Sequence, residues 1–287
     1  MSSKGRKTSK SAAVRVLSAT KFSGLSVVVP AYNETANIRP LVERLFTSMK
    51  KENSKLDVEV LFVDDESVGT KKTIEIVHQL EKEGYAVRIH SRKKTEGRGL
   101  SSAVLLGFAK AKYETILCMD ADLQHEPEAV YSVALPVLNK KAEFTVGSRN
   151  VEGGGCGFDW AIHRRLLSTG ATMLAYGVSK SSDPMSGFFC TTKTVLNRGL
   201  SKINPIGFKI GLEVMARCKA TPVIDVPITF QDRVAGESKL SMTQNVHYVR
   251  QLLSLYIDVA PLTFLSIIML IACVMYIVLN QMNKMLK

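Results

Sequence analysis

The chain has 287 residues, of which 46% are hydrophobic and 22% are charged, and its formal net charge is +12. This composition excludes a wholly disordered chain, and the length suits one large domain or two small ones. Five scattered cysteines without a C-x-x-C pair exclude a disulfide scaffold and argue against a zinc cluster. They indicate reduced thiols in a protein that faces the cytosol.

The excess of positive charge is concentrated at the amino terminus. Residues 1–21 carry six Lys or Arg side chains and no acid, which is half of the net charge. Such a basic, Ser-rich segment is most often a flexible, solvated tail, and the alternative is attraction to an anionic membrane surface. Net charge alone is weak evidence for nucleic-acid binding, so we expect no nucleic-acid partner.

Short apolar runs alternate with helical patterns along most of the chain. The runs typical of strands cover residues 25–29, 58–63, 86–90, 115–119 and 144–147, and helical spacing covers 36–49, 72–83, 100–112, 127–139 and 161–176. This alternation predicts an α/β fold of Rossmann-like type, with a mostly parallel sheet and helices on both faces. We expect this domain to cover residues 22–244.

An uncharged apolar segment lies near the carboxyl terminus. Residues 259–279 read VAPLTFLSIIMLIACVMYIVL, and no charge occurs between Asp258 and Lys284. As a helix this segment would be about 32 Å long, which matches a bilayer core of about 30 Å. We predict a transmembrane helix at 259–279, an amphipathic juxtamembrane helix at 245–258 and a short lumenal tail at 280–287. Many more basic residues precede this helix than follow it, where only Lys284 and Lys287 occur. Since basic residues favour the cytosolic side of a membrane helix, we expect the main domain to be cytosolic.

Polar residues follow four of the predicted strands, where parallel sheets form their ligand crevice. The segments are Pro30-Ala31-Tyr32-Asn33-Glu34, Val63-Asp64-Asp65, Asp120-Ala121-Asp122-Leu123-Gln124 and Gly147-Ser148-Arg149, and we expect them to line consecutive edges. Because the sequence has neither a P-loop nor a G-x-G-x-x-G motif, a bound nucleotide would be held through a metal on its diphosphate. Asp120 and Asp122 are hard ligands that suit Mg²⁺ or Mn²⁺, and Gln124 offers a third oxygen. A D-x-D motif alone is weak evidence, since acids at strand ends often cap the next helix.

Together these segments resemble glycosyltransferase family two, whose fold is called GT-A, and within it the dolichol-phosphate mannosyltransferases. The narrower resemblance adds the segments 164–168, 183–188, 207–213 and 232–240, and it extends over roughly residues 24–256. A single membrane helix at the carboxyl end is also typical of the one-chain forms of this family. The loop at 64–70 is one residue shorter than in most relatives, which leaves its geometry open.

The resemblance implies a site for GDP-mannose, dolichyl phosphate and one divalent metal ion, Mg²⁺ or Mn²⁺. It assigns the guanosine to Pro30, Tyr32, Glu34, Val63 and Asp65, and the metal and diphosphate to Asp120, Ala121, Asp122 and Gln124. It assigns phosphate-facing roles to Arg149, Arg233 and Lys239, which with Asp122 form the catalytic set, and the acceptor phosphate to Arg164 and Ser168. It also implies the lipid bilayer as a partner and the cytosolic face of the endoplasmic reticulum as the location. The membrane helix suggests that no partner subunit is required for anchoring.

The expected chemistry is attack by the lipid phosphate on the anomeric carbon of the sugar, with inversion. A phosphate monoester is largely dianionic at pH 7 and needs no general base. Two alternatives remain open: the same fold using UDP-glucose, and a membrane-tethered protein that binds a nucleotide without catalysis. His125 follows the D-x-D motif, and we expect it to be a surface or hydrogen-bonded histidine rather than a metal ligand.

Overall fold

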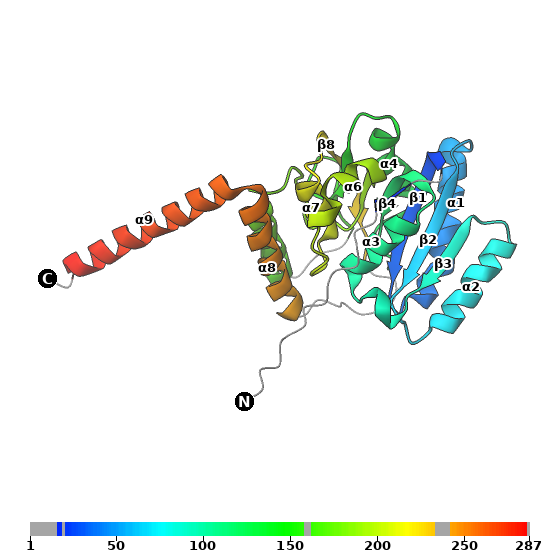
Figure 1. Cartoon of the computed structure of the whole chain (residues 1–287), viewed down its shortest axis with the longest axis horizontal. Helices are drawn as coiled ribbons and strands as arrows, with labels where there is room; N and C mark the ends of the chain where they lie inside the picture. Colours follow the sequence, from blue (N-terminus) through cyan, green and yellow to red (C-terminus); the bar gives the residue numbers. More distant parts are fainter. Residues whose placement is uncertain (1–15, 19–20, 158–161, 233–241, 286–287) are drawn as a thin grey trace.

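The computed structural model describes residues 16–18, 21–157, 162–232 and 242–285, without the side chains of residues 22, 94, 162–167, 242 and 283–285. In this part of the chain, the central sheet has seven strands in the order β3-β2-β1-β4-β7-β5-β8 (Figure 1). The strands are β1 (Lys21–Ala31), β2 (Val58–Asp64), β3 (Val87–Ser91), β4 (Tyr113–Cys118), β5 (Phe144–Ser148), β7 (Phe189–Thr192) and β8 (Val223–Pro227). The short strands β6 (Gly155–Cys156) and β9 (Thr229–Phe230) pair separately.

The mostly parallel sheet expected from the sequence is confirmed. Strands β1, β2, β3 and β4 pair in parallel, as do β5 and β8, whereas β7 is antiparallel to both of its neighbours. The expectation that the ends of the fourth and fifth predicted strands are consecutive edges is wrong, because β7 lies between β4 and β5. Since β7 runs in the opposite direction, its amino-terminal end and the preceding residues 183–188 lie at the carboxyl edge of β4 and β5.

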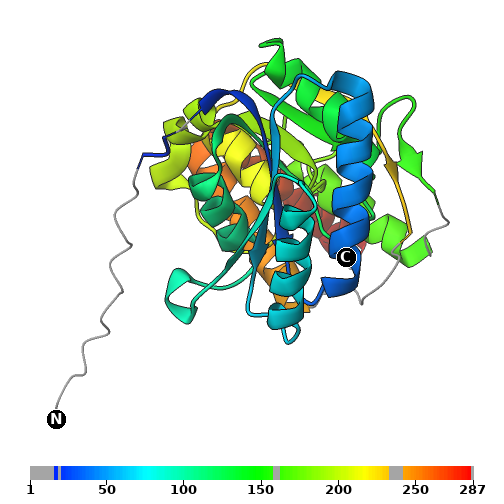
Figure 2. The ribbon, with the colours of Figure 1, turned by 90° about the vertical axis from the view of Figure 1, so that its right-hand side faces the viewer.

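Helices cover both faces of the sheet and bury a hydrophobic core on each. On one face pack α1 (Ile38–Asn53), α2 (Thr70–Lys82) and α4 (Val130–Leu138), and on the other α3 (Leu100–Lys110), α6 (Lys193–Gly199), α7 (Ile210–Arg217) and α8 (Met242–Val259). Successive residues of a strand point to opposite faces, so Val27 joins the first core and Val28 the second. In Figure 2 the blue helix α1 and the green helix α3 lie on either side of the strands.

Short 3-10 turns adjust the ends of several predicted helices. They are η1 (Thr35–Asn37), η2 (Lys94–Glu96), η3 (Pro127–Ala129) and η4 (Leu200–Lys202). The helix expected at 36–49 therefore begins as η1 and continues as α1 to Asn53, and the helix expected at 127–139 begins as η3. The helix expected at 161–176 is α5 (Ile162–Ala175).

The carboxyl-terminal part consists of two helices joined at Ala260. Helix α8 packs into the core on the face of the sheet that α3, α6 and α7 cover, through the buried Leu252 and Leu255. Helix α9 (Pro261–Met285) begins with a proline, which fits the first turn, and extends away from the domain (Figure 1). Its segment Pro261–Met282 has a mean hydropathy of 2.8 and by length and composition can cross a membrane.

Candidate functional site

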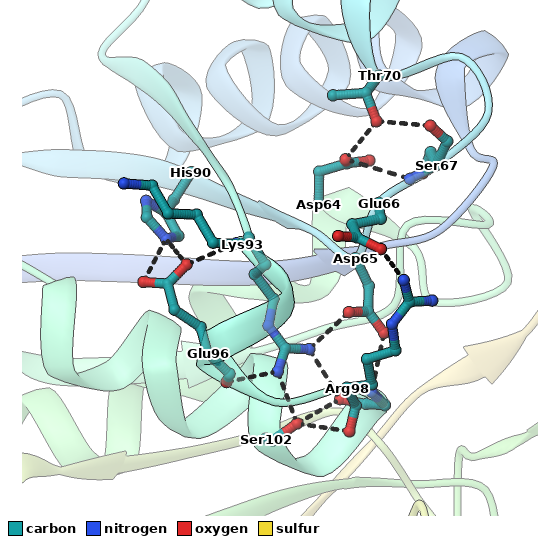
Figure 3. A network of polar contacts seen from close by, with 12 residues as sticks. Asp64, Asp65, Glu66, Ser67, Thr70, His90, Lys93, Glu96, Arg98 and Ser102 are labelled. Atoms are coloured by element: carbon teal, nitrogen blue, oxygen red, sulfur yellow. Dashed lines mark hydrogen bonds and ion pairs between the residues drawn. The ribbon is translucent and has the colours of Figure 1, made fainter. Parts of the chain in front are cut away.

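The end of β2 is held by a network of polar contacts around Asp65 (Figure 3). The guanidinium of Arg92 donates to Asp65 Oδ1 at 2.8 Å, and the backbone N–H of Gly99 donates to Asp65 Oδ2 at 2.8 Å. Arg92, whose side chain is only 1% exposed, also donates to Ser102 Oγ at 2.8 Å. Asp65 therefore joins β2 to the loop before α3, in addition to the nucleotide-binding role expected for it.

The loop at 64–70, which is shorter than in most relatives, is hydrogen-bonded to the loop after β1. Asn33 N donates to Ser67 Oγ at 2.8 Å, and Val68 N donates to Asn33 Oδ1 at 2.9 Å. Thr70 Oγ1 donates to Asp64 Oδ2 at 2.7 Å, which anchors the start of α2 (Figure 3). These reciprocal bonds define the geometry that the sequence left open.

The residues expected to hold the guanosine differ in how they can reach a ligand. Tyr32 is 42% exposed, and its aromatic ring has a flat surface that suits a base. Glu34 is almost buried and accepts a hydrogen bond from Asn37 Nδ2 at 2.8 Å. Pro30 and Val63 are buried in the fold, so their contact with a nucleotide would be through the backbone.

The D-x-D motif forms a tight turn directly after β4. Gln124 N donates to Asp122 Oδ1 at 3.2 Å, and Leu123 has a positive φ of 62°, which folds the chain back. The Asp120 side chain is 38% exposed, whereas Asp122 is 7% exposed, and Ala121 between them is buried. Two carboxylates that are separated by a single residue repel each other, and a cation bound beside them removes this repulsion.

His125 supports this turn from inside the protein. Its Nδ1 accepts the backbone N–H of Asp120 at 3.2 Å, so Nδ1 carries no proton. Burial lowers the pKa of His125, against the opposing effect of Asp120 and Asp122. The 3.6 Å contact between Nδ1 and Asp120 Oδ2 is therefore not an ion pair at neutral pH. The ring packs 5.1 Å from Phe188 and 5.4 Å from Phe230, measured between centroids. His125 is therefore a buried, hydrogen-bonded histidine, and the alternative of a surface position is wrong.

Two hydrogen bonds, one from a backbone N–H and one from a side-chain amide, join the segment after β9 to the D-x-D turn. Gln231 N donates to Gln124 O at 2.9 Å, and Gln124 Nε2 donates to Gln231 O at 3.1 Å. Gln231 thus fixes the chain two residues before Arg233. Arg233 and Lys239 lie outside the described residues.

The expected acceptor residues lie on α5. Ser168 is partly exposed on this helix, and Arg164 stands one turn before it. The side chain of Arg164 lies outside the described part of the structure. Since residues four apart share a helix face, both positions are on one side of α5.

Arg149, after β5, forms a buried ion pair that the sequence did not reveal. Its Nε and Nη2 donate to the two carboxylate oxygens of Asp183 at 2.7 and 2.8 Å. Burial alone would raise the pKa of Asp183, but the hydrogen bonds and charge of Arg149 outweigh it and lower that pKa. The guanidinium also lies 5.1 Å from the centre of the Phe230 ring. Asp183 reaches Arg149 because β7 is inserted next to β5.

Lys209 is a second cation that the sequence placed in a family segment without a role. Its Nζ donates to the backbone carbonyl of Met185 at 2.6 Å. Burial lowers the pKa of Lys209 to about 8, and Arg149 adds to this decrease, while Asp120 and Asp183 oppose it. Lys209 therefore shares its electrostatic environment with the D-x-D turn and with the Arg149–Asp183 pair.

The donor set at the turn fits a hard divalent cation. In the described part of the chain, no group of three or more His, Cys, Asp or Glu side chains could hold a metal by itself. Asp120, Asp122 and the Gln124 amide supply oxygen ligands only, which Mg²⁺ and Mn²⁺ prefer. Such a site leaves coordination positions for phosphate oxygens of a substrate.

Comparison with known proteins identifies the family of this chain. The family model described as "Glycosyl transferase family 2" matches residues 26–201. A dolichol-phosphate mannosyltransferase of Saccharomyces cerevisiae is 44% identical over 86% of this chain and 95% of its own, and one of Mycosarcoma maydis is 42% identical over 86% and 84%. The structure of glucosyl-3-phosphoglycerate synthase from Mycobacterium tuberculosis with Mn²⁺ and UDP superposes with a TM-score of 0.52, at 19% identity over 83% of this chain and 80% of that one. That likeness shows the GT-A fold. The chain belongs to glycosyl transferase family 2 and, within it, to the dolichol-phosphate mannosyltransferases.

Proposed function

We propose that this protein transfers mannose from GDP-mannose to dolichyl phosphate, forming dolichyl β-D-mannosyl phosphate and GDP. The observation that carries the proposal is the D-x-D turn after β4, with Arg149 at the same edge of the sheet. The similarity to fungal dolichol-phosphate mannosyltransferases over most of the chain also supports this proposal.

The donor nucleotide would lie along the ends of β1 and β2. Tyr32 would pack its exposed ring against the base, and Glu34 and Asp65 would accept hydrogen bonds from the guanosine. Pro30 and Val63 would contribute backbone contacts. The network around Asp65 supports this role because it holds the carboxylate in one orientation before any ligand binds.

Asp120, Asp122 and Gln124 would hold Mg²⁺ or Mn²⁺, and Ala121 would contact the nucleotide through its backbone. When bound, the ion neutralises negative charge that develops on the leaving diphosphate. The solved structure of the mycobacterial synthase contains Mn²⁺ together with UDP, which supports a divalent ion in a fold of this type.

The transfer step needs no protein base. An oxygen of the acceptor phosphate forms a bond to the anomeric carbon from the face opposite the diphosphate. The bond from that carbon to the β-phosphate oxygen breaks, and its electron pair leaves with GDP. No proton moves, so the protein contributes position and positive charge, for which we propose Arg149, Arg233 and Lys239.

Two helices next to the site provide a surface for the lipid. Tyr248 Oη donates to Ala171 O at 2.6 Å and Tyr256 Oη donates to Leu174 O at 2.9 Å, which joins α8 to α5. Large apolar side chains are exposed on both helices, namely Met173, Leu174, Val246, Val249, Leu253 and Ile257, and Tyr176 is exposed directly after α5. Those of α8 follow a spacing of three or four residues and so form one face.

We infer that this face rests on the membrane that α9 crosses. Dolichyl phosphate would then present its phosphate to Arg164 and Ser168 on α5. The proposal includes a single-pass anchor in the endoplasmic reticulum membrane with a cytosolic catalytic domain. It requires neither a partner subunit nor nucleic acid.

The test is transfer of labelled sugar to dolichyl phosphate by the purified full-length protein in detergent. GDP-mannose and UDP-glucose are offered separately, each with Mn²⁺ and with EDTA. We expect transfer from GDP-mannose only, and only with the metal. Transfer from UDP-glucose would overturn the donor, and nucleotide binding without transfer from either donor would favour a non-catalytic, membrane-tethered protein.

A further inference from the structure

A salt bridge connects the loop after β2 to the loop before α3. The Arg98 guanidinium contacts Glu66 Oε2, and in Figure 3 both groups lie beside Asp65. The next residue along the chain, Gly99, donates its backbone N–H to Asp65 Oδ2 at 2.8 Å. The Glu66–Arg98 pair is therefore at the carboxyl edge of the sheet, next to a residue for which we propose a contact with the guanosine.

The backbone of Glu66 directs its side chain to this edge. Successive side chains of a strand point to opposite faces, but Glu66 follows β2 and has a positive φ of 56°, which ends this alternation. The left-handed conformation is unfavourable for a residue with a Cβ atom, whereas glycine adopts it without that cost. The chain therefore places a carboxylate beside Asp65 at a cost in free energy, which favours a role for this carboxylate in binding.

The residues that follow Glu66 contact the loop that carries Tyr32. Asn33 N donates to Ser67 Oγ at 2.8 Å, and Val68 N donates to Asn33 Oδ1 at 2.9 Å. Tyr32 directly precedes Asn33 and is 42% exposed. A base that packs against the ring of Tyr32 would therefore lie near the salt bridge.

The exposure of the pair argues against a purely structural role. The side chain of Arg98 is 59% exposed and that of Glu66 is 26% exposed. Water and salt screen such a pair, so it contributes little to the stability of the fold. A guanidinium has five N–H donors, which is more than one carboxylate can accept. Arg98 can therefore donate to a ligand and to Glu66 at the same time.

The residues that the family resemblance assigns to the guanosine include no cation. Both carboxylate oxygens of Asp65 already accept protein N–H groups, from Arg92 and Gly99, at 2.8 Å. A single carboxylate can accept an N–H of uracil as well as one of guanine. A second carboxylate and a cation would therefore add selectivity for the base.

The two charges of the salt bridge match the hydrogen-bonding edge of guanine. This edge has two adjacent donors, N1–H and the N2 amino group, and one acceptor, O6, beside them. Uracil has a single N–H donor between two carbonyl acceptors, so a carboxylate can make only one such bond to it. We propose that Glu66 accepts the N1–H and N2–H groups of the guanine and that Arg98 donates to its O6. This inference rests on the proposed function and deepens it, because it names two residues that select the base of the donor.

The competing explanation is a salt bridge that only ties two loops together. Glu66→Gln and Arg98→Met break the pair in either case, whereas the double variant Glu66→Arg with Arg98→Glu forms it again with the charges exchanged. Exchanged charges can tie the loops but do not match guanine. Arg198→Met is the matched control, because Arg198 donates to both oxygens of Glu143 at 2.7 Å and the Glu143 side chain is also 26% exposed. Glu143 precedes β5, so this pair lies at the opposite edge of the sheet.

The experiment measures Kd by calorimetry for GDP, inosine diphosphate (IDP) and UDP, each with Mn²⁺. It uses full-length proteins in detergent, after thermal melting has shown that they fold. The base of IDP is guanine without its N2 amino group. We expect Glu66→Gln to raise the Kd for GDP about tenfold and the Kd for IDP by less. Arg98→Met should raise both values by a similar factor of about five, since both bases carry O6. The Kd for UDP in these variants, and all three values in Arg198→Met, should stay within about twofold of the wild type.

The double variant decides between the two explanations. We expect its Kd for GDP to be at least about tenfold above that of the wild type. A Kd within about threefold of the wild type would overturn the proposal, because it would show that the salt bridge only ties the loops. Equal losses of affinity for GDP and IDP in Glu66→Gln would overturn the contact to the N2 amino group. If Glu66→Gln does not fold, Glu66→Ala takes its place under the same criterion.

These measurements also separate this inference from the proposed function. If the wild type binds GDP no more tightly than UDP, the proposed donor is wrong and the inference fails with it. If the wild type prefers GDP and the variants of Glu66 and Arg98 keep this preference, only the inference is overturned. If the wild type binds GDP but transfers no sugar, the proposed function fails, and the Kd values still test the two residues.

Discussion

The two ends of the crevice differ in what balances their charges. At the end of β2, the Asp65 carboxylate is matched by the buried Arg92 guanidinium and by the Gly99 N–H, all within the protein. At the end of β4, Asp120 and Asp122 are like charges separated by Ala121, and the backbone N–H of Gln124 donates to Asp122 Oδ1. The end of β2, where we propose that the nucleotide binds (the nucleotide end), is therefore held by contacts within the protein. For the end of β4, where we propose that the phosphates bind (the phosphate end), our proposal is that a cation and the substrates balance the charge.

The largest effect should come from the charge at the phosphate end. Asp122→Asn removes one of the two carboxylates proposed to hold the metal, and we expect kcat/KM to fall at least about 100-fold. Binding of Mn²⁺ in the presence of GDP, measured by calorimetry, should weaken in parallel. The control is Asp57→Asn, which changes an exposed carboxylate outside the crevice. Wild-type activity of Asp122→Asn would contradict the metal-binding role and with it the contrast between the two ends.

The second effect concerns stability, because Asp183 neutralises a mostly buried arginine. Asp183→Asn leaves the Arg149 guanidinium without its carboxylate, and we expect the free energy of unfolding to fall by about 3 kcal/mol. Since the folded pKa of Asp183 is lowered, this stabilisation is present at neutral pH and is lost as the pH falls through that lowered pKa.

Thermal melting in detergent checks this prediction against a pair of similar geometry at the surface. Arg44 donates to both oxygens of Glu128 at 2.8 and 2.7 Å, but both side chains are largely exposed. Glu128→Gln should therefore lower the melting temperature much less than Asp183→Asn, because solvent screens exposed pairs. Equal decreases for the two variants would show that burial of the Arg149 pair adds nothing.

The sequence predicted which carboxylates follow the strands better than it predicted the contacts that the inserted strand β7 creates, and the reason is topological. Asp65, Asp120 and Asp122 follow strands whose apolar runs are easy to recognise, so their place at one edge could be expected. Strand β7 has only four residues and pairs antiparallel between β4 and β5. Periodicity indicates elements but not their order in a sheet, so Asp183 and Lys209 had no assigned contact until the fold placed them beside Arg149.

At the nucleotide end, the contact of Arg92 was likewise not predictable from local sequence patterns. It follows β3, and nothing in its local pattern indicates that its guanidinium is buried against Asp65, which lies 27 residues earlier. The resemblance to a family supplied roles for Arg149, Arg233 and Lys239, but not the ion pair that Arg149 forms. Contacts between distant residues depend on packing, which a single sequence does not encode in any local spacing.

A third prediction concerns pH, since the pKa of Lys209 lies near 8. If its charge is needed, kcat/KM should decrease above pH 8, approaching tenfold per pH unit, because the free enzyme then loses the ammonium proton. The charged neighbours that set this pKa are Arg149, Asp120 and Asp183. Lys209→Arg should remove this decrease, because a guanidinium stays protonated over this range. An unchanged alkaline limb in Lys209→Arg would assign it to another group.

The smallest effect should come from α8, through Gln251. Gln251 Nε2 donates to the Lys209 carbonyl and to Glu213 Oε2, both at 3.1 Å, so Gln251→Ala removes bonds that position Lys209 without touching a substrate. Ser254→Ala is the control, because Ser254 Oγ accepts from Arg217 at 2.8 Å across the same pair of helices but does not contact Lys209.

Both variants should lower stability by about 1 kcal/mol, the usual net value of such a hydrogen bond. Only Gln251→Ala should also lower kcat, by about three- to tenfold, with the KM for GDP-mannose unchanged, because the nucleotide end lies on other strands. A purely structural role would give equal kcat values for Gln251→Ala and Ser254→Ala. A fall in kcat confined to Gln251→Ala would instead show that the helix preceding the membrane segment sets the geometry of the phosphate end and leaves the nucleotide end unaffected.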